Sequence, residues 1–291
     1  VNAVEPNTND TLLSLERLKV ELRLWKLLKK EVEIEEISIR NATFDTRDFI
    51  DGVVVNGHLG ELYLESHGVV FSPETARINE FSVKNTDVSL TLENMEDTDT
   101  TTTEPIYWKI LLDEIDFENV GFALNMPQDS LFVRTMLPKT TLKDGVIDLK
   151  EASYYVKSFD MDNAELAYGP KEELSLKQIG LQLDSIYYCG KDIRANIEEF
   201  VLKERSGLEL VSTEGRIVSD SVLIEIPKFT MKTTASSLDL QTKIGWDVLE
   251  MKKTGVLSAK INAEIGKGDV AKILGGRDTL FLQTYPNKPF V

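Results

Sequence analysis

Residues 112–122, LDEIDFENVGF, carry the pattern that decides the fold. Apolar residues alternate with charged ones up to Phe117, and after Asn119 the alternation resumes one position late, at Val120. Alternation with a period of two residues is typical of a β-strand with one wet face. The same register recurs as IEEISIRNATF (34–44), INEFSVKNTDV (78–88) and VKSFDMDNAEL (156–166), with starts 44, 34 and 44 residues apart. Self-similarity at such periods indicates a repeat architecture.

The asparagine in each copy predicts a change of chain direction. A slip of one residue would turn the later side chains to the opposite face unless an extra residue is absorbed locally. A β-bulge or a tight corner can absorb that residue, and asparagine tolerates the left-handed backbone often needed there. We therefore predict corner residues at Asn41, Asn85, Asn119 and Asn163. The alternative is a polar ladder that binds a ligand, but one asparagine every 34 to 44 residues is too sparse for a cation site.

The composition excludes several classes of partner. The chain has 291 residues and a formal net charge of -16, from 33 basic and 49 acidic residues. Phosphate binding needs a basic patch, so nucleic acid is a poor partner. An anionic membrane surface is equally unfavourable for the body of the molecule. Much of the acidic excess lies on alternate strand positions, which is typical of a solvated sheet face.

The order of the segments predicts an all-β protein with very little helix. Weaker echoes of the register extend it to about residue 245, so we expect one elongated, curved, repetitive domain over residues 1–291. Residues 93–105, ENMEDTDTTTTEP, are acidic and Thr-rich, and predict a flexible surface loop. A short turn of helix is expected at 25–31, and a helix at 266–276 with Asp269 as its cap. There is neither an apolar run long enough to span a bilayer nor a signal peptide, and the initial Val1 indicates that an upstream segment has been removed.

No residue pattern predicts an enzyme, a cofactor site or a metal site. His58 and His67 are the only histidines, and zinc would need further ligands that the sequence does not place near them. Cys189 has no neighbouring histidine, so we expect an inert thiol and no internal disulfide. Adjacent carboxylates such as Glu198-Glu199 point to opposite faces of a strand and do not form a glycosidase pair. Phosphate-binding and nucleophile-elbow motifs are also missing.

The apolar side of the predicted sheet is the candidate functional surface. If successive repeats stack side by side, their inward residues form one strip, which needs a cover: a second layer, a helix or an apolar ligand. The sequence offers almost no helix for this purpose. A sheet folded over to a dry core and a trough filled by a lipid-like molecule are both open at this point. The residues expected to line the strip are Ile37, Ile39, Phe44, Phe81, Val83, Val88, Ile115, Phe117, Phe122, Phe159, Met161 and Leu166.

The chain resembles the AsmA-like superfamily, and most closely its TamB type as found in Bacteroidetes-like bacteria. Three stretches carry the resemblance: LERLKVELRLWKLLKKEVEIEEISIRNATFDT (15–46), LGELYLESHG (59–68) and LDSIYYCGKDIRANIEEFVLKERSGLEL (183–210). It extends to about residue 250. The motifs are alternation of residue types, with no invariant chemistry among them.

The resemblance implies a periplasmic protein that an N-terminal helix tethers to the inner membrane. It also implies a taco-like β-sheet trough with an apolar concave face. Such proteins are implicated in phospholipid transfer between the inner and outer membranes, and in outer-membrane protein assembly with a barrel partner of the TamA type. By this resemblance, we expect the membrane helix and the C-terminal domain that would engage the barrel to lie outside the given sequence.

Two functions follow as expectations. In the first, the concave face holds phospholipid acyl chains during transfer through the periplasm. In the second, a dry scaffold that binds no lipid positions the barrel-assembly partners. A carbohydrate-active β-helix enzyme is a third reading, and it predicts a cleft with converging carboxylates or basic residues.

Overall fold

A computed structural model of the protein describes residues 2–4, 11–27, 31–47, 52–71, 74–93, 107–251 and 255–274. Strands account for most of these residues, so the all-β prediction is confirmed. The strands are β1 (Asn2–Val4), β2 (Thr11–Leu22), β3 (Glu31–Asp45), β4 (Val53–Phe71), β5 (Glu74–Leu92), β6 (Lys109–Met126), β7 (Leu131–Asp148), β8 (Ser153–Tyr168), β9 (Leu174–Cys189), β10 (Asp192–Glu204), β11 (Glu209–Ser219), β12 (Leu223–Thr233), β13 (Ser237–Gly245) and β14 (Leu257–Glu264). The helices are α1 (Leu24–Leu27), α2 (Trp246–Leu249) and α3 (Lys267–Leu274).

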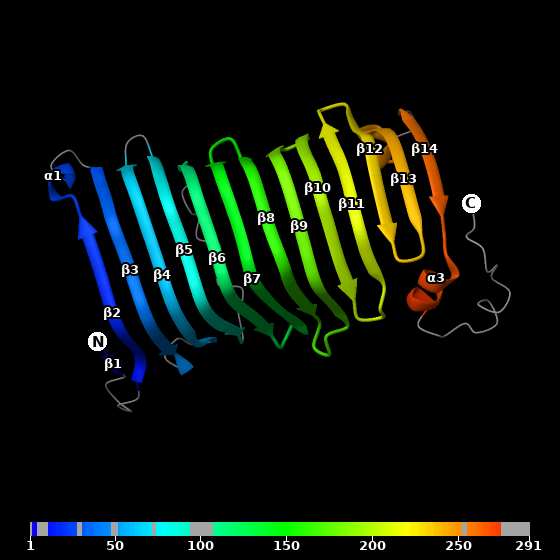
Figure 1. The fold of residues 1–291 in the computed structure, drawn as a ribbon. Coiled ribbons are helices and arrows are strands. Elements are labelled where there is room, and N and C mark those ends of the chain that lie inside the picture. Colours follow the sequence, from blue (N-terminus) through cyan, green and yellow to red (C-terminus); the bar gives the residue numbers. More distant parts are fainter. Residues whose placement is uncertain are drawn as a thin grey trace. The chain divides into compact units, whose positions relative to one another are not determined.

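The strands follow one another in chain order within one hydrogen-bonded sheet (Figure 1). β5 and β6 run parallel, whereas their neighbours β4 and β7 pair with them antiparallel. This arrangement explains the unequal spacing of the repeats. The copies in β3 and β5 are separated by the antiparallel strand β4, while the copies in β5 and β6 lie directly side by side. The shorter interval of 34 residues therefore marks the one place where no return strand lies between two copies.

The chain forms two compact units. The N-terminal unit comprises Val1–Glu151 and Asn163–Ser175, and the C-terminal unit comprises Ala152–Asp162 and Leu176–Val291. The prediction of a single domain stays a prediction. The predicted flexible loop lies outside the described residues from position 94 onward. Within the described ranges, no helix has the length and apolar character needed to cross a bilayer.

The predicted corner residues adopt the left-handed backbone conformation. Asn41, Asn85, Asn119 and Asn163 have φ angles of 47°, 49°, 54° and 54°. No register shift occurs at this level in the five pairings from β2 to β7, so the structure forms a corner and not a bulge. Register is kept because the strands that pair skip equal numbers of residues at this level, one on each strand in four of the pairings and two on each strand between β4 and β5. This corner row consists of Glu16, Asn41, Gly60, Asn85, Asn119 and Pro138.

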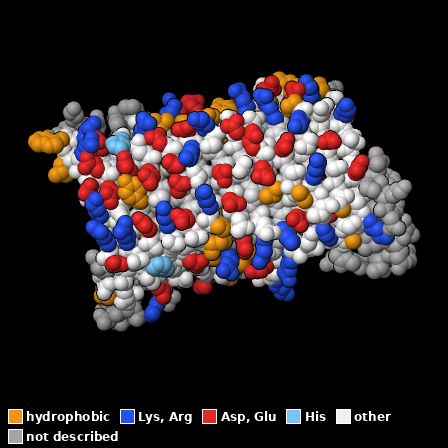
Figure 2. Space-filling view, in the orientation of Figure 1, with side chains coloured by type: hydrophobic (Ala, Val, Ile, Leu, Met, Phe, Trp, Pro, Cys, Tyr) orange, Lys and Arg blue, Asp and Glu red, His pale blue; other side chains and the backbone are white. Residues whose placement is uncertain are grey.

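Side chains along the corner row contact one another across the strands. The Asn41 amide donates a hydrogen bond to the Glu16 carboxylate, and the Asn119 amide donates to Oδ1 of Asn85 over 3.3 Å. Beyond the bend, the far ends of β5, β6 and β7 recede from the viewer in Figure 1. The face turned toward the viewer is rich in charged residues (Figure 2). The apolar face of the N-terminal unit is therefore on the inner side of the bend, as predicted.

Helix α3 in the C-terminal unit confirms the helix predicted near residue 266, but Asp269 does not cap it in the expected way. Its carboxylate is buried and accepts hydrogen bonds from the hydroxyls of Thr233, Ser236 and Thr234, the last two over 2.6 and 3.4 Å. Lys272 lies 3.8 Å away. Asp269 thus ties α3 to the turn between β12 and β13. Sequence reasoning assigned it to the helix alone because hydroxyls more than 30 positions away cannot be recognised from local spacing.

The tie at Asp269 predicts that α3 detaches in acid. Burial by itself would raise the pKa of Asp269, but the Ser236 and Thr233 hydroxyls and Lys272 lower it below the ordinary 3.8. A carboxyl whose folded pKa is depressed contributes its full stabilisation above the ordinary value and loses it as pH falls through the folded pKa. We expect the Asp269→Ala variant to reproduce the acid state at neutral pH, with a loss of about 2 kcal/mol.

Hydrogen exchange of the 266–274 segment, corrected for intrinsic rates, measures this effect. Exchange should accelerate in Asp269→Ala and in wild type below the ordinary carboxyl pKa. Asp239→Ala, an exposed position on β13, is the matched control and should leave the segment protected. Unchanged protection in Asp269→Ala would contradict the assigned role.

Candidate functional site: the apolar face of the N-terminal unit

The strand registers assemble the apolar residues of the N-terminal unit into rows that cross the sheet. On one side of the corner row, two rows run from β2 to β7; on the other side, two more rows follow. The first pair of rows is Val20, Ile37, Leu64, Phe81, Ile115, Leu142 and Leu18, Ile39, Leu62, Val83, Phe117, Thr140. The second pair is Leu15, Ala42, Leu59, Thr86, Val120, Leu137 and Leu13, Phe44, Gly57, Val88, Phe122, Thr135. Leu59 and Thr86 fall at one level because the pairs on either side, His58 with Asp87 and Glu61 with Lys84, share one register. We call these four rows together the apolar face.

The structure brings nine of the twelve predicted strip residues onto this face. The rings of Phe81 and Phe117 meet edge to face with centroids 6.2 Å apart, so the two neighbouring rows share one side of the sheet. Leu166 belongs to the same unit, on β8. Phe159 and Met161, also on β8, are half-buried and fall in the C-terminal unit.

Sequence reasoning did not include the residues that fill the gaps between the copies. Leu59, Leu62 and Leu64 on β4, and Leu137 and Leu142 on β7, complete the rows. These return strands lack the asparagine that marks a copy, and they carry Gly60 or Pro138 at the corner instead. In the sequence, only the alternation of apolar and polar residues on either side of the corner position could have identified them.

Nothing among the described residues of the unit forms a second layer over the apolar face. Its strands pack against their hydrogen-bonded neighbours, and α1 packs against β3. In the described part of the chain no large side chain is fully buried, and Phe122 is 39% exposed. Closed β-sandwich cores normally bury such side chains against a facing sheet about 10 Å away. The described strands therefore do not fold over to form a dry core within this unit.

The opposite face is a lattice of cross-strand charges. In one row Arg40, Glu61, Lys84 and Glu118 are paired in register, with Arg40–Glu61 and Lys84–Glu118 ion pairs of 3.4 Å each. In another, Lys143 lies 2.8 Å from Glu114. That carboxylate is the main cause of the raised pKa of Lys143. Exposed pairs of this kind contribute little to stability, so the lattice chiefly keeps this face hydrated. Figure 2 shows the mixture of both signs of charge across it.

The two histidines and the cysteine are not brought together. His58 and His67 lie nine positions apart on β4, where His67 Nδ1 is 2.6 Å from Oδ1 of Asn79. Cys189 is at the end of β9 in the other unit. No group of three or more metal-ligating side chains occurs within the ranges that the structure describes.

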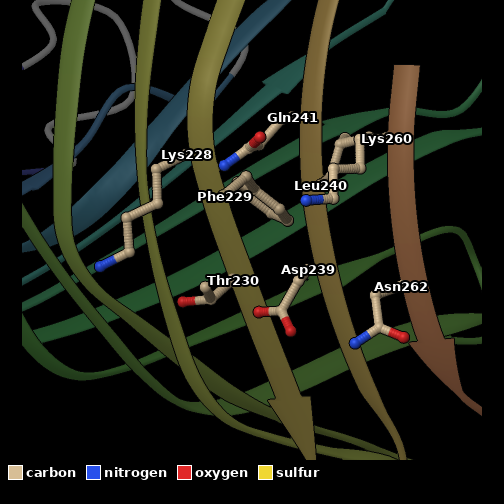
Figure 3. Close-up of a pocket in the computed structure, with 8 residues that line it drawn as sticks. All are labelled: Lys228, Phe229, Thr230, Asp239, Leu240, Gln241, Lys260 and Asn262. Carbon is tan, nitrogen blue, oxygen red and sulfur yellow. The ribbon is translucent and has the colours of Figure 1, made fainter.

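The described strands of the C-terminal unit bear shallow hollows, among them one of about 360 Å³ and one of about 290 Å³. The larger is lined by residues of β12, β13 and β14, which include the apolar Phe229 and Leu240 and the charged Lys228, Asp239 and Lys260. Figure 3 shows these side chains spread along three strands without converging on one point. Lys228 also pairs with Glu214 at 3.3 Å. The hollows have apolar lining residues, but they lack the converging polar groups that fix a ligand in small-molecule sites.

No family model matches this chain, and no curated protein matches its sequence. The AsmA-like resemblance therefore stays a prediction. The apolar face is the candidate site on geometry alone.

Proposed function

We propose that the protein holds the acyl chains of phospholipid on its apolar face. One observation carries the proposal: four cross-strand rows of apolar side chains line the inner side of a bent sheet, and no described residue forms a layer over them. Exposed apolar patches of this extent mark interaction surfaces in soluble proteins. An occupant without polar specificity suits a surface without polar groups arranged to recognise it.

The dimensions of the face suit an acyl chain. Strands lie about 4.8 Å apart, so the six strands from β2 to β7 give a strip of about 24 Å. A single leaflet supplies about half of the ~30 Å hydrocarbon thickness of a bilayer, so the strip is longer than one acyl chain. Each methylene removed from water contributes about 0.8 kcal/mol. About ten methylenes are then enough for micromolar affinity from water.

Under this proposal, the transfer of an acyl chain between a membrane and the apolar face has a free-energy change close to zero. A chain that leaves a bilayer for the apolar face moves from one apolar environment to another, so little free energy is lost or gained. Such a surface can accept and release lipid without trapping it. This property fits the role that the AsmA-like resemblance implies, in which a periplasmic segment of a TamB-type protein moves phospholipid between the inner and outer membranes. We extend the proposal to support of outer-membrane protein assembly, through parts beyond this chain that meet the inner membrane and the TamA-type barrel.

Native mass spectrometry of gently purified protein tests the proposal. We expect masses that exceed the chain by one or more phospholipids, and their loss after delipidation followed by recovery on adding phosphatidylethanolamine. Protein that neither carries lipid after purification nor takes it up afterwards would overturn the proposal in favour of a scaffold without lipid.

A further inference from the structure

The strand ends at one edge of the C-terminal unit carry a cluster of exposed apolar side chains. The edge is defined by pairing, since Tyr188 pairs with Ile193, Ile193 with Ser219, and Leu223 with Gly245. Tyr154 joins it because its ring centroid lies 6.0 Å from that of Tyr188. We call this cluster the rim, which consists of Tyr154, Tyr188, Val222, Leu249, Met251 and Val256, all between 41% and 93% exposed.

The rim is held in place by a polar framework behind it. The indole N–H of Trp246 donates to the carbonyl of Asp220 over 2.7 Å, and the backbone N–H of Trp246 donates to the carbonyl of Val222 over 3.0 Å. The Lys191 ammonium lies 4.9 Å from the centre of the Trp246 ring and 2.6 Å from the Glu250 carboxylate. These contacts join α2 to the turns that follow β9 and β11. The rim residues are therefore presented by an ordered framework.

The rim continues the apolar side of this unit past the ends of its strands. A row formed by Tyr188, Ile193, Ser219, Ile224, Ile244 and Leu257 crosses the sheet next to the rim. The other end of β12 and β13 is different, since Asp269 fastens α3 there. One end of the unit thus bears a fastened helix, and the other bears uncovered apolar side chains.

We infer that the rim seats against the surface of a lipid bilayer, an inference that rests on the proposed function because a lipid carrier has to meet a membrane. Tyrosine and tryptophan favour the water–membrane interface because their rings are amphipathic. Methionine and valine beside them can enter the acyl boundary, as apolar residues of interfacial segments do. Among the described residues beside the rim, Lys191 is paired with Glu250, which balances its charge. With a chain charge of -16, the matching surface is zwitterionic.

Co-flotation with phosphatidylcholine vesicles tests the inference. Wild-type protein should float with the vesicles, and the double variant Val222→Glu, Met251→Glu should bind about tenfold more weakly, because two side chains lose their favourable insertion. Val211→Glu is the matched control: Val211 lies on β11 of the same unit, is 49% exposed and is outside the rim, so flotation should be unchanged. Thermal melting of each variant verifies that the fold is retained.

Trp246 reports the contact directly. With Trp25 and Trp108 changed to Phe, its fluorescence should be quenched by brominated phosphatidylcholine vesicles.

Wild type that fails to float, or a rim variant that floats and is quenched like wild type, overturns the inference. A wild-type dimer that the rim variant dissociates would also overturn it, since the rim would then bind a second copy. Lipid uptake from monomeric short-chain phospholipid, followed by native mass spectrometry, should persist in the rim variant. Wild-type protein that does not take up this phospholipid would instead refute the proposed function.

Discussion

Replacing Phe122 with Glu is expected to abolish the binding of acyl chains while the protein stays folded. Phe122 lies on the apolar face beyond the corner row, beside Val88, and is 39% exposed. A carboxylate at this position can remain hydrated in the empty protein, so stability changes little. A bound acyl chain would have to bury that charge, and burial of an unpaired charge is strongly unfavourable. Bound lipid in native mass spectra should fall by at least about tenfold.

The adjacent residue supplies the control for this variant. Ala123 points to the opposite, charged face and pairs with Arg134, so Ala123→Glu adds the same charge without touching the apolar face. Its lipid occupancy should match wild type. Phe81→Glu is a useful third variant because the Phe81 ring packs on Phe117, and we expect a loss of about 3 kcal/mol in stability along with lipid. If Phe122→Glu keeps its lipid, the apolar face is not where lipid binds.

A single methyl group at Gly60 is expected to destabilise the corner row severely. A Cβ added at Gly60 would lie 2.6 Å from the carbonyl oxygen of Asn85 and 2.8 Å from that of Lys84. Both are backbone atoms of the neighbouring strand, so neither can move without disturbing the corner there. We expect Gly60→Ala to lower the free energy of unfolding by about 3 kcal/mol, the upper part of the usual range for overpacking.

Gly190 separates this clash from the general effect of replacing a glycine. It has a φ of +57°, and a Cβ there would meet nothing within 4 Å. Gly190→Ala therefore reports only the strain of a left-handed alanine, about 1 kcal/mol. Urea denaturation of both variants gives the comparison. Equal losses would show that close approach at the corner is not what requires glycine at position 60.

Sequence alone predicted the corners because the evidence for them is local. The parity slip after Asn119 and the tolerance of asparagine for positive φ together indicated a left-handed residue, and the structure has one in all four copies. Gly60 and Pro138 occupy the same level in the return strands, but their role depends on which strand lies opposite. Left-handed residues at Asp144, Gln178 and Ser185 follow no repeated motif and were not predicted.

The candidate face was predicted in part for the same reason. Alternation gave the inward residues of each copy. Equivalence between the copies predicted one row of Ile37, Phe81, Ile115 and Phe159; the strand registers join the first three, and Phe159 belongs to the C-terminal unit. The parallel pairing of β5 with β6 was not predicted, because strand direction is set by a long connection whose residues carry no pattern. The framework behind the rim was missed as well: Lys191, Asp220 and Trp246 are far apart in sequence, and only the fold joins them.

The corner row also bears on how such a chain can change in length. Each copy of the repeat from β3 to β6 contains its own left-handed asparagine, and the strands from β2 to β7 keep the same register on both sides of the corner row. The bend is thus a property of each copy and is not imposed by neighbours at a distance. Duplicating one copy together with its return strand would extend the sheet sideways and leave its cross-section unaltered. Gene duplication would in this way change the length of the apolar surface and leave unchanged the cross-section that contacts the bound lipid.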